Sequence, residues 1–367
     1  MIPSHSQDDS SLSNSPNRGE KGATLHHMNN IKKAAEILSK ASFLLITCGA
    51  GFSQDSGLAV YKDIASHQVY KKKNLEYHDL ARPVSCCDDM LLEYYGFWIH
   101  CVQTYFKTPS HSGYQILQKW KEKMFEKKII PNEFFEKQKS LLSDSEWFNE
   151  ENNHKIAKNV FIYSSNVDNH FSRYFNREEI YNIHGHVFNW QCGKPCSEKS
   201  VWKVSNLDEF EIDENTMEIN SKDLQKLTCP HCEEHSMPNV LMFGDLGQYI
   251  RNKEEEDRYI AWECSVETFS REMQCLSEYG NTKYPFVIIE LGCGLRVPSV
   301  RLENECVLLD CDQSFLIRIN VGQEELDTIH NEELKPLKNE RILCLQGGCE
   351  KVLKEIDHEL EERFKLD

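Results

Sequence analysis

The chain has 367 residues, 40% of them hydrophobic and 28% charged, which is enough to bury a core in one large domain with an insertion or in two domains. Its formal net charge of −17 argues against direct binding to nucleic acid and is compatible with a basic peptide as partner. The sequence has no apolar run of about 20 residues, so we expect no membrane-spanning helix.

The 15 cysteines, together with the lack of a secretory signal peptide, predict a reducing compartment, the cytoplasm or the nucleus. Thiols in such a compartment serve metal binding, packing or chemistry and rarely form structural disulfides. The sequence does not indicate an oligomeric state.

The first segment, residues 1–28, is rich in Ser, Asn, Asp and Gly and lacks apolar periodicity, so we expect a disordered tail. Residues 29–367 are predicted to form one domain made of several parts. From Ile31 on, apolar residues recur at helical spacing and predict a helix that leads into the first strand.

The apolar run at residues 42–48 has the length of a buried parallel strand, and Gly-Ala-Gly follows it at residues 49–51. Glycines at the end of such a strand let a phosphate approach backbone N–H groups, which is typical of a nucleotide-binding turn. The spacing is not G-x-G-x-x-G, so an ordinary tight turn is the alternative. Ser53 and Ser56, which precede Gly57, favour the nucleotide-binding interpretation.

Residues 67–157 are predicted to form a helical insertion. Apolar and aromatic residues between Leu91 and Phe106 recur three or four positions apart, and the pattern repeats from Tyr114 to Lys128. We interpret this segment as helices that pack a core of their own, in preference to an aromatic cofactor pocket.

A second predicted strand, residues 159–164, ends in Ser165, Asn166 and Asp168. Open α/β sheets bind ligands at the carboxyl ends of their strands, so Asn166 and Asp168 are candidate site residues. Capping of the following helix by either side chain is the alternative.

A third apolar run, residues 180–183, leads to His184, Gly185 and His186. A histidine in a turn at a strand end is a candidate general base, because the unperturbed pKa of imidazole lies near neutrality. The alternative is that His184 is a turn residue bonded to nearby backbone.

Two close cysteine pairs follow, Cys192 with Cys196 and Cys229 with Cys232. In a reducing compartment, such pairs form a tetrahedral thiolate cage for one Zn²⁺. Four sulfur ligands leave no open position for water, so the zinc is expected to be structural. Residues 191–237 are predicted to be the zinc module.

The remaining predicted strands lie at residues 237–243, 286–291, 306–310, 315–320 and 341–345, with a charged helix at about 254–279 and a closing helix to Phe364. Strands alternating with helices predict an α/β fold with a doubly wound, Rossmann-like parallel sheet. The Rossmann-like parts are residues 29–66, 158–190 and 238–367.

Seven motifs, in order over roughly residues 30–360, resemble those of sirtuins, the NAD-dependent protein deacylases. The stretch from Gly49 resembles G-A-G-I-S-x-x-S-G-I, residues 164–168 resemble T-Q-N-I-D, and residues 183–185 resemble the L-H-G of the catalytic histidine. The cysteine pairs resemble the zinc ribbon of the family. Residues 240–245 resemble V-x-F-G-E, residues 292–295 resemble G-T-S-L, and residues 319–320 resemble the late I-N. The chain is similar to divergent members, which have V-P-x-V-R after the late glycine turn.

The resemblance implies NAD as cofactor, one structural Zn²⁺, an acylated-lysine protein or peptide as substrate, and nicotinamide and acyl-ADP-ribose as products. The catalytic residues it implies are His184, Asn166 and Asp168. The implied NAD contacts are Gly49, Ala50, Gly51, Ser53, Ser56, Tyr61, Lys62, Ser165, Asn166, Asp168, Gly292, Cys293, Gly294, Asn320 and Cys349. The implied substrate contacts are Val240, Phe243 and Gly244.

The sequence departs from the family at the nicotinamide end of the implied pocket. Residues 59–62 read Ala-Val-Tyr-Lys where sirtuins have P-D-F-R, and a lysine is not equivalent to an arginine at a planar contact. Ser165 replaces a glutamine, and Met237 replaces an arginine. Two further functions therefore stay open, an ADP-ribosyltransferase or NAD hydrolase and a catalytically silent module that binds NAD or ADP-ribose.

Overall fold

The computed structural model describes residues 18–59, 67–149, 151–152, 154–197, 199–204, 206–245, 247–273 and 286–364. The helices are α1 (Arg18–Lys40), α2 (Ala50–Gln54), α4 (Gln68–Lys72), α5 (Tyr77–Leu80), α6 (Leu91–Lys107), α7 (Ser112–Trp120), α8 (Asn132–Leu142), α9 (Lys253–Met273), α10 (Ser299–Asp310), α11 (Gln323–Asp327), α12 (Lys338–Arg341) and α13 (Cys349–Phe364). The strands are β1 (Phe43–Cys48), β2 (Val160–Ser164), β3 (Ile180–Asn182), β4 (Gly185–Cys192), β5 (Val201–Lys203), β6 (Ile212–Asp213), β7 (Glu218–Ile219), β8 (Ser236–Val240), β9 (Phe286–Leu291), β10 (Ser314–Asn320) and β11 (Ile342–Gln346).

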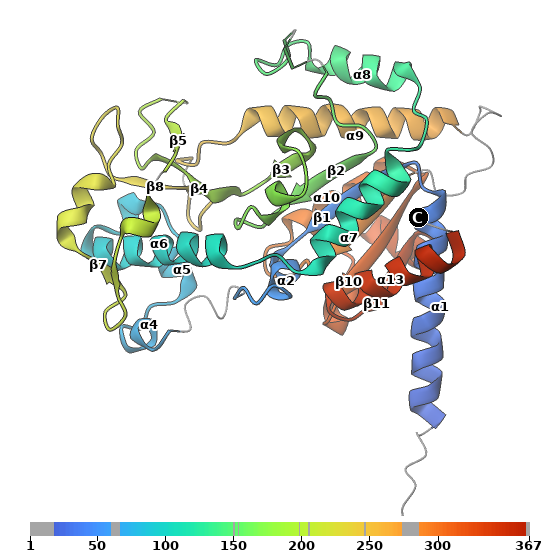
Figure 1. Ribbon diagram of the computed structural model, residues 1–367, viewed down its shortest axis with the longest axis horizontal. Coiled ribbons are helices and arrows are strands. Elements are labelled where there is room, and N and C mark those ends of the chain that lie inside the picture. The colour runs from blue at the N-terminus through green and yellow to red at the C-terminus, as the bar shows by residue number, and fades with distance from the viewer. Residues whose placement is uncertain are drawn as a thin grey trace, which may run out of the picture.

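A six-stranded parallel sheet forms the large domain, with the strand order β11-β10-β9-β1-β2-β3. The chain builds the sheet from β1 outward through β2 and β3, and then from β9 outward through β10 and β11 on the other side (Figure 1). The order reverses between β1 and β9, and open α/β sheets bind their ligands at such a switch point. The predicted doubly wound, Rossmann-like sheet is confirmed.

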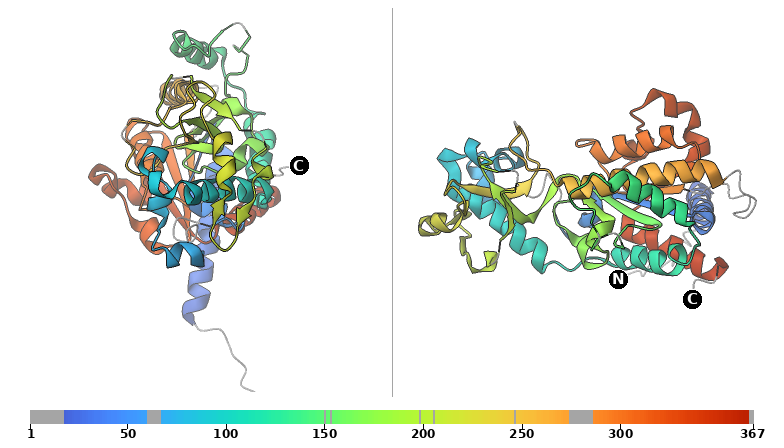
Figure 2. Two further views of the ribbon diagram at one scale, coloured as in Figure 1. Left: turned by 90° about the vertical axis from the view of Figure 1, so that its left-hand side faces the viewer. Right: turned by 90° about the horizontal axis from the view of Figure 1, so that it is seen from above.

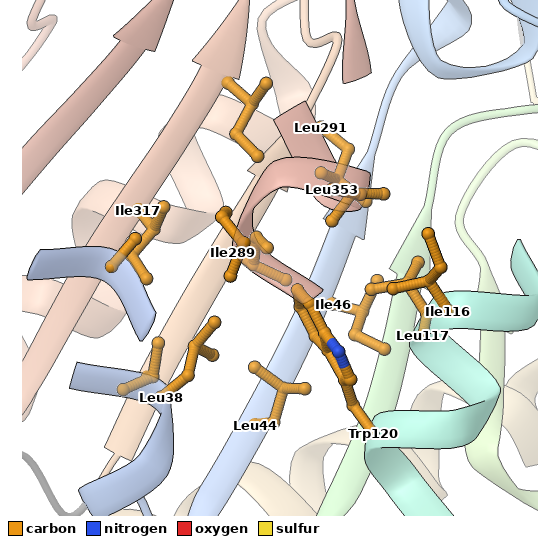
Figure 3. Close-up of a cluster of buried hydrophobic side chains, with 14 of the residues drawn as sticks. Leu38, Leu44, Ile46, Ile116, Leu117, Trp120, Ile289, Leu291, Ile317 and Leu353 are labelled. Carbon is orange, nitrogen blue, oxygen red and sulfur yellow. The ribbon is translucent and has the colours of Figure 1, made fainter. Parts of the chain in front are cut away.

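Strand β1 is buried on both faces, as expected for a central parallel strand. Its side chains alternate between the two faces, since successive residues of a strand point in opposite directions. Leu44 and Ile46 pack in a cluster with side chains of α1, α7 and α13, and Figure 3 shows both beside Trp120. Phe43 and Leu45 face the opposite cluster, to which α8, α9 and α10 contribute.

A smaller domain is built on a three-stranded antiparallel sheet with the order β5-β4-β8. Its core holds Trp190 of β4 together with Tyr95 and Trp98 of α6. Ile219 of the two-stranded β6–β7 sheet packs into the same core. Figure 2 shows this domain at one end of an elongated molecule and the large sheet at the other.

The helices predicted as one insertion divide between these two cores. Helix α6 packs in the small domain, whereas Tyr114 and Trp120 of α7 pack against the large sheet. Strands β4 and β8, assigned from the sequence in part to the Rossmann-like portion, pair with each other in the small sheet. Helical or strand periodicity reveals that an apolar face exists but not which surface covers it.

Two sequence predictions differ from the structure. Residues 306–310, expected as a strand, form the last part of α10, because Val307 and Leu308 lie on the buried face of a helix that also buries Val300 and Asn304. Short apolar runs fit either structure. Helix α1 begins at Arg18, within the segment expected to be a disordered tail, and residues 1–17 lie outside the described part of the chain. Among the described helices, none combines the length and apolar character needed to cross a membrane.

Four charged side chains are buried together beside the sheet. Glu290 of β9 lies within 3.1 Å of Arg301 of α10 and within 2.7 Å of Arg318 of β10. Glu305 lies 3.7 Å from Arg318 and accepts the backbone N–H groups of His330 and Asn331. Buried charges persist only when they are paired and hydrogen-bonded, so the two glutamates and two arginines depend on one another.

Replacing Glu290 by glutamine keeps the side-chain shape and leaves the two buried arginines with Glu305 as their only acid within this cluster. We expect the free energy of unfolding to fall by about 3–5 kcal/mol, the usual cost of removing one partner from a buried ion pair. Chemical denaturation measures this. The control is the same change at Glu324, which is exposed on α11. Equal stability of the two variants would contradict the prediction.

Candidate active site

Two glycine turns meet at the switch point of the sheet. The N–H of Gly49 donates to the carbonyl of Leu291 at 3.0 Å, and the N–H of Gly51 donates to the carbonyl of Gly292 at 3.0 Å. A side chain on Gly51 would place its Cβ 2.7 Å from that carbonyl oxygen, and Gly292 has a φ of +61°. The lack of a side chain at Gly51 therefore lets the backbone turn at Gly292 pack against it. The sequence interpretation considered only the approach of a phosphate and did not include this packing.

Replacing Gly51 by alanine should lower stability, because the methyl group would press on backbone that has no free space. Overpacking of this kind costs about 1–3 kcal/mol. The control is Gly294→Ala, since a Cβ at Gly294 would meet no atom of the described chain within 4 Å. Thermal unfolding compares the two variants, and a melting temperature of Gly51→Ala equal to that of Gly294→Ala would refute this account.

Ser53 links the polar residues that follow β2. Its hydroxyl donates to Asp168 Oδ2 at 2.5 Å and accepts from Asn166 Nδ2 at 2.9 Å. Asp168 Oδ1 accepts the backbone N–H of His170 at 2.9 Å, and His170 is the first residue of the short helical turn His170–Arg173, whose N-cap is Asn169. Asp168 therefore joins the polar cluster and also satisfies one backbone N–H at the start of this turn.

His184 lies between β3 and β4, in the connection from the large to the small domain. Its ring lies close to the Ser165 backbone, and one nitrogen of a neutral imidazole carries a lone pair that can accept a proton. Burial lowers the pKa of His184 below its usual value, and the bond to Ser165 opposes part of that shift. The half-buried side chain is therefore neutral and able to accept a proton at pH 7.

His186 has different surroundings. Its Nε2 lies 3.2 Å from Asn189 Nδ2, and burial together with the charges of Arg177 and Lys203 lowers its pKa to about 4. The side chain is not part of the cavity that His184 lines. The two histidines of the sequence motif are therefore separated in space and in chemistry.

A cavity of about 250 Å³ lies between the two domains. It is lined by many residues that the sequence singled out: Ala50, Ser53, Ser165, Asn166, Asp168, His184, Val240 and Phe243. It is also lined by residues that the sequence analysis did not assign to a site: Leu58, Ala59, Tyr77, Ala81, Tyr105, Val167, Leu241, Met242, Val297 and Ser299. Tyr105 could not be singled out from the sequence, because it is one of several aromatic residues in α6. Val297 and Ser299 follow the second glycine turn closely, and that position in the sequence could have marked them as candidate site residues.

Other predicted NAD contacts do not line this cavity. Ser56 Oγ accepts the N–H of His111 at 3.0 Å, and Cys349 is buried at the start of α13. The side-chain amide of Asn320 is used inside the protein, by the Cys293 carbonyl at 3.0 Å and the Gly322 N–H at 3.3 Å. Gly49, Gly51, Gly292, Cys293 and Gly294 form the two turns beside the cavity, and Gly244 follows its wall residue Phe243. Tyr61 and Lys62 lie outside the described residues.

The four predicted zinc ligands come together in the small domain. The sulfur atoms of Cys192, Cys196, Cys229 and Cys232 all lie within 4.8 Å of one another. Cys192 and Cys232 are 3.5 Å apart, and Cys196 and Cys229 are 3.9 Å apart. Tetrahedral Zn²⁺ with Zn–S bonds of about 2.3 Å needs sulfur atoms about 3.8 Å apart, so the four thiols fit one zinc.

Solved structures of Sir2 proteins have this architecture. The chain is similar to a Sir2 homologue in complex with NAD, at 14% identity over 92% of this chain and 95% of that chain, with a TM-score of 0.54. A substituted Sir2 homologue in complex with 2′-O-acetyl-ADP-ribose matches at 14% identity over 90% of this chain and 96% of that chain, with a TM-score of 0.53. A Sir2 variant with a deacetylated p53 peptide and 3′-O-acetyl-ADP-ribose matches at 15% identity over 90% of this chain and 98% of that chain, with a TM-score of 0.50.

No protein-family model and no curated protein matches the chain. The class is therefore defined by the fold, a Rossmann-like sheet with a small domain that carries a zinc-ribbon type of cysteine cluster. The chain has the fold of the sirtuins.

Proposed function

We propose that the chain is an NAD-dependent enzyme of the sirtuin type that removes acyl groups from lysine side chains of proteins. One observation carries the proposal: His184 shares one cavity with Asn166 and Asp168 at the carboxyl ends of the parallel strands, and burial lowers its pKa, which favours the neutral form. The similar Sir2 structures contain NAD in one case and an acetyl-ADP-ribose with a deacetylated peptide in another. These ligands support the assignment of cofactor and substrate class.

The residues at the switch point fit a dinucleotide. Helix α2 begins at Ala50 directly after the strand, and the turn at Gly294 is exposed with open space on its side-chain face. Backbone N–H groups in such turns suit phosphate oxygens. NAD would supply an electrophilic ribose carbon whose leaving group is nicotinamide. Asn166 would hold the nicotinamide ribose, and Asp168 would hold the carboxamide.

His184 would act as the general base that takes a proton from a ribose hydroxyl. Burial lowers its pKa, so the neutral form, whose unprotonated ring nitrogen can accept a proton, dominates at pH 7. Ser53 would keep Asn166 and Asp168 in place, because its hydroxyl bonds to both side chains. Hydrogen bonds among the protein's own side chains hold the site in one arrangement, which reduces the cost of ordering it.

The acylated peptide would enter between the domains, at the segment that follows β8. Leu241 and Phe243 of this segment are 40% and 38% exposed, and both line the cavity. The N–H of Leu241 already donates to the backbone carbonyl of His184, and the N–H of Phe243 donates to the backbone carbonyl of Ala81. The remaining backbone groups between Val240 and Gly244 would pair with the peptide as an added strand.

A specific feature keeps a second function open. Ser165 and His184 line the same cavity, and Ser165 stands where sirtuins have a glutamine, so the shorter side chain would leave more room for water or another acceptor. Transfer of ADP-ribose to a protein, or hydrolysis of NAD, would follow from such an acceptor.

One assay separates these functions. The protein is incubated with NAD and a mixture of acetyl-lysine peptides, and mass spectrometry follows free lysine peptide, free ADP-ribose and protein-linked ADP-ribose. Loss of acetyl groups that depends on NAD supports deacylation. Free or protein-linked ADP-ribose without loss of acetyl groups supports the second function. NAD that binds but is not consumed would refute both and indicate a silent binding module.

A further inference from the structure

The peptide bond between Cys293 and Gly294 is held from one side. The carbonyl oxygen of Cys293 accepts from Asn320 Nδ2 at 3.0 Å and from Arg301 Nη1 at 3.4 Å. Arg301 is fully buried and Asn320 is 7% exposed, so this carbonyl points into the protein. The described chain has no cis peptide bond, and the N–H of a trans peptide points opposite to its carbonyl. The N–H of Gly294 therefore points outward, at an exposed residue.

Both donors are themselves fixed. Asn320 Oδ1 accepts the N–H of Gly322, which sets the direction of the side-chain amide. Arg301 binds Glu290 with Nη1 and donates to the Thr328 carbonyl with Nη2 at 2.7 Å. Arg301 thus connects the buried charge cluster of β9, β10 and α10 to the glycine turn and helps to hold the Cys293 carbonyl in place.

The Gly294 N–H has no hydrogen-bond acceptor within the described part of the backbone, and a Cβ at this position would meet nothing within 4 Å. Gly294 has no side chain that could donate a hydrogen bond, so its N–H is the one donor that this position offers to a ligand. Oxygen atoms of phosphate or ribose are matching acceptors.

We propose that Asn320 and Arg301 are positioning residues of the nucleotide site: they hold the Cys293 carbonyl inward, so that the Gly294 N–H donates to an oxygen of the ADP-ribose part of NAD. The proposal rests on the proposed NAD-dependent function. The sequence resemblance implies a direct contact between Asn320 and NAD. We propose an indirect role instead, because the side-chain amide of Asn320 already bonds to the Cys293 carbonyl and the Gly322 N–H.

The role of the Gly294 N–H as donor is tested first, by isothermal titration calorimetry of the full chain with ADP-ribose and with NAD. Gly294→Pro removes the N–H, and Gly294→Ala keeps it and adds a methyl group in open space. We expect Kd to rise about tenfold for the proline variant, the usual effect of one lost hydrogen bond, and to stay within about twofold for the alanine variant. Equal Kd values for the two variants would overturn the proposal.

The positioning residues are tested against a buried asparagine of the same charge cluster. Asn320→Ala removes the bond to Cys293, whereas Asn304→Ala removes bonds to Thr47 and Glu290 only. Both should lower the melting temperature, but only Asn320→Ala should raise Kd, about tenfold. Arg301→Lys keeps the positive charge beside Glu290 and should raise Kd about threefold, because the bond it loses is the longer one. Equal rises in Kd for Asn320→Ala and Asn304→Ala would overturn the proposal.

A double variant separates positioning from direct contact. If Asn320 acts through the Gly294 N–H, then Gly294→Pro with Asn320→Ala should weaken binding no more than Gly294→Pro alone. Additive losses would show that Asn320 contacts the nucleotide itself and would overturn the proposal. A wild-type chain that binds neither NAD nor ADP-ribose would overturn the proposed function together with this proposal. A wild-type chain that binds NAD, with variants that behave against expectation, would overturn the positioning role alone.

Discussion

Replacing His184 by alanine is expected to lower turnover about 10²–10⁴-fold, the usual effect of removing a general base. NAD affinity and zinc content should remain, because the polar cluster of Ser53, Asn166 and Asp168 does not depend on this side chain and the cysteine cluster is built from other residues. Steady-state kinetics, calorimetry with NAD and metal analysis of the same preparation measure the three quantities.

The pH dependence follows from the direction of the pKa shift. Burial lowers the pKa of His184, so the neutral, proton-accepting form is already dominant near neutrality. Turnover should rise with pH on the acidic side, through a pKa below the ordinary value of about 6.5, and level off above it. The same shift costs stability in acid, because the unfolded state binds a proton in this pH range and the folded state does not.

His186→Ala is the control for this experiment. His186 lies two residues from His184 in the sequence, but it bonds to Asn189 and does not line the cavity. Its replacement should leave turnover within about twofold of the wild type, as is usual for changes away from the reacting groups. If both variants lose turnover equally, or if His184→Ala loses only stability, His184 is a structural turn residue and the proposed base is wrong.

Replacing Cys232 by serine is expected to remove one equivalent of zinc and to destabilise the small domain. Structural zinc sites contribute apparent binding energies of about 10–16 kcal/mol in small zinc peptides, so loss of one ligand has a large effect. The cysteine cluster joins the end of β4 to the segment before β8, and these strands pair in the sheet that faces the cavity. Metal analysis and thermal unfolding measure the two consequences.

Cys306→Ser is the matched control, because Cys306 is also an exposed thiol but belongs to α10 of the large domain. It should keep the zinc content and the melting temperature of the wild type. Wild-type protein purified without chelator and found free of zinc would contradict the assignment. So would a Cys232→Ser variant that keeps its metal.

The apolar runs revealed the sheet because parallel strands are covered on both faces. Strands β1 and β2 are apolar runs, β9 is apolar except for Glu290, and all three end in glycine or polar turns, a pattern that is readable without knowledge of the fold. Where the apolar run was short, at residues 306–310, the same signal gave the wrong element, since a helix can bury such a run on one face.

The charged residues within apolar strands were the signal that the sequence analysis did not use. Glu290 and Arg318 interrupt the apolar strands β9 and β10, and a charge in such a strand requires a buried partner. Which partner it finds depends on α10, whose Arg301 and Glu305 complete the cluster. The link from this cluster to the Cys293 carbonyl could not be read from spacing in the sequence.

The sequence by itself determined the features that are local along the chain: the strand and glycine turn at residues 42–51, the polar ends of the strands, and the paired cysteines. Each depends on residue types at short, fixed spacing, and the cysteine pairs indeed meet in one cluster. Only the tertiary structure decided that α6 belongs to the small domain, that Tyr105 reaches the cavity and that His184 shares that cavity with Asp168. These contacts join residues that are distant in sequence, so they depend on how the two domains pack, and local patterns carry no information about that packing.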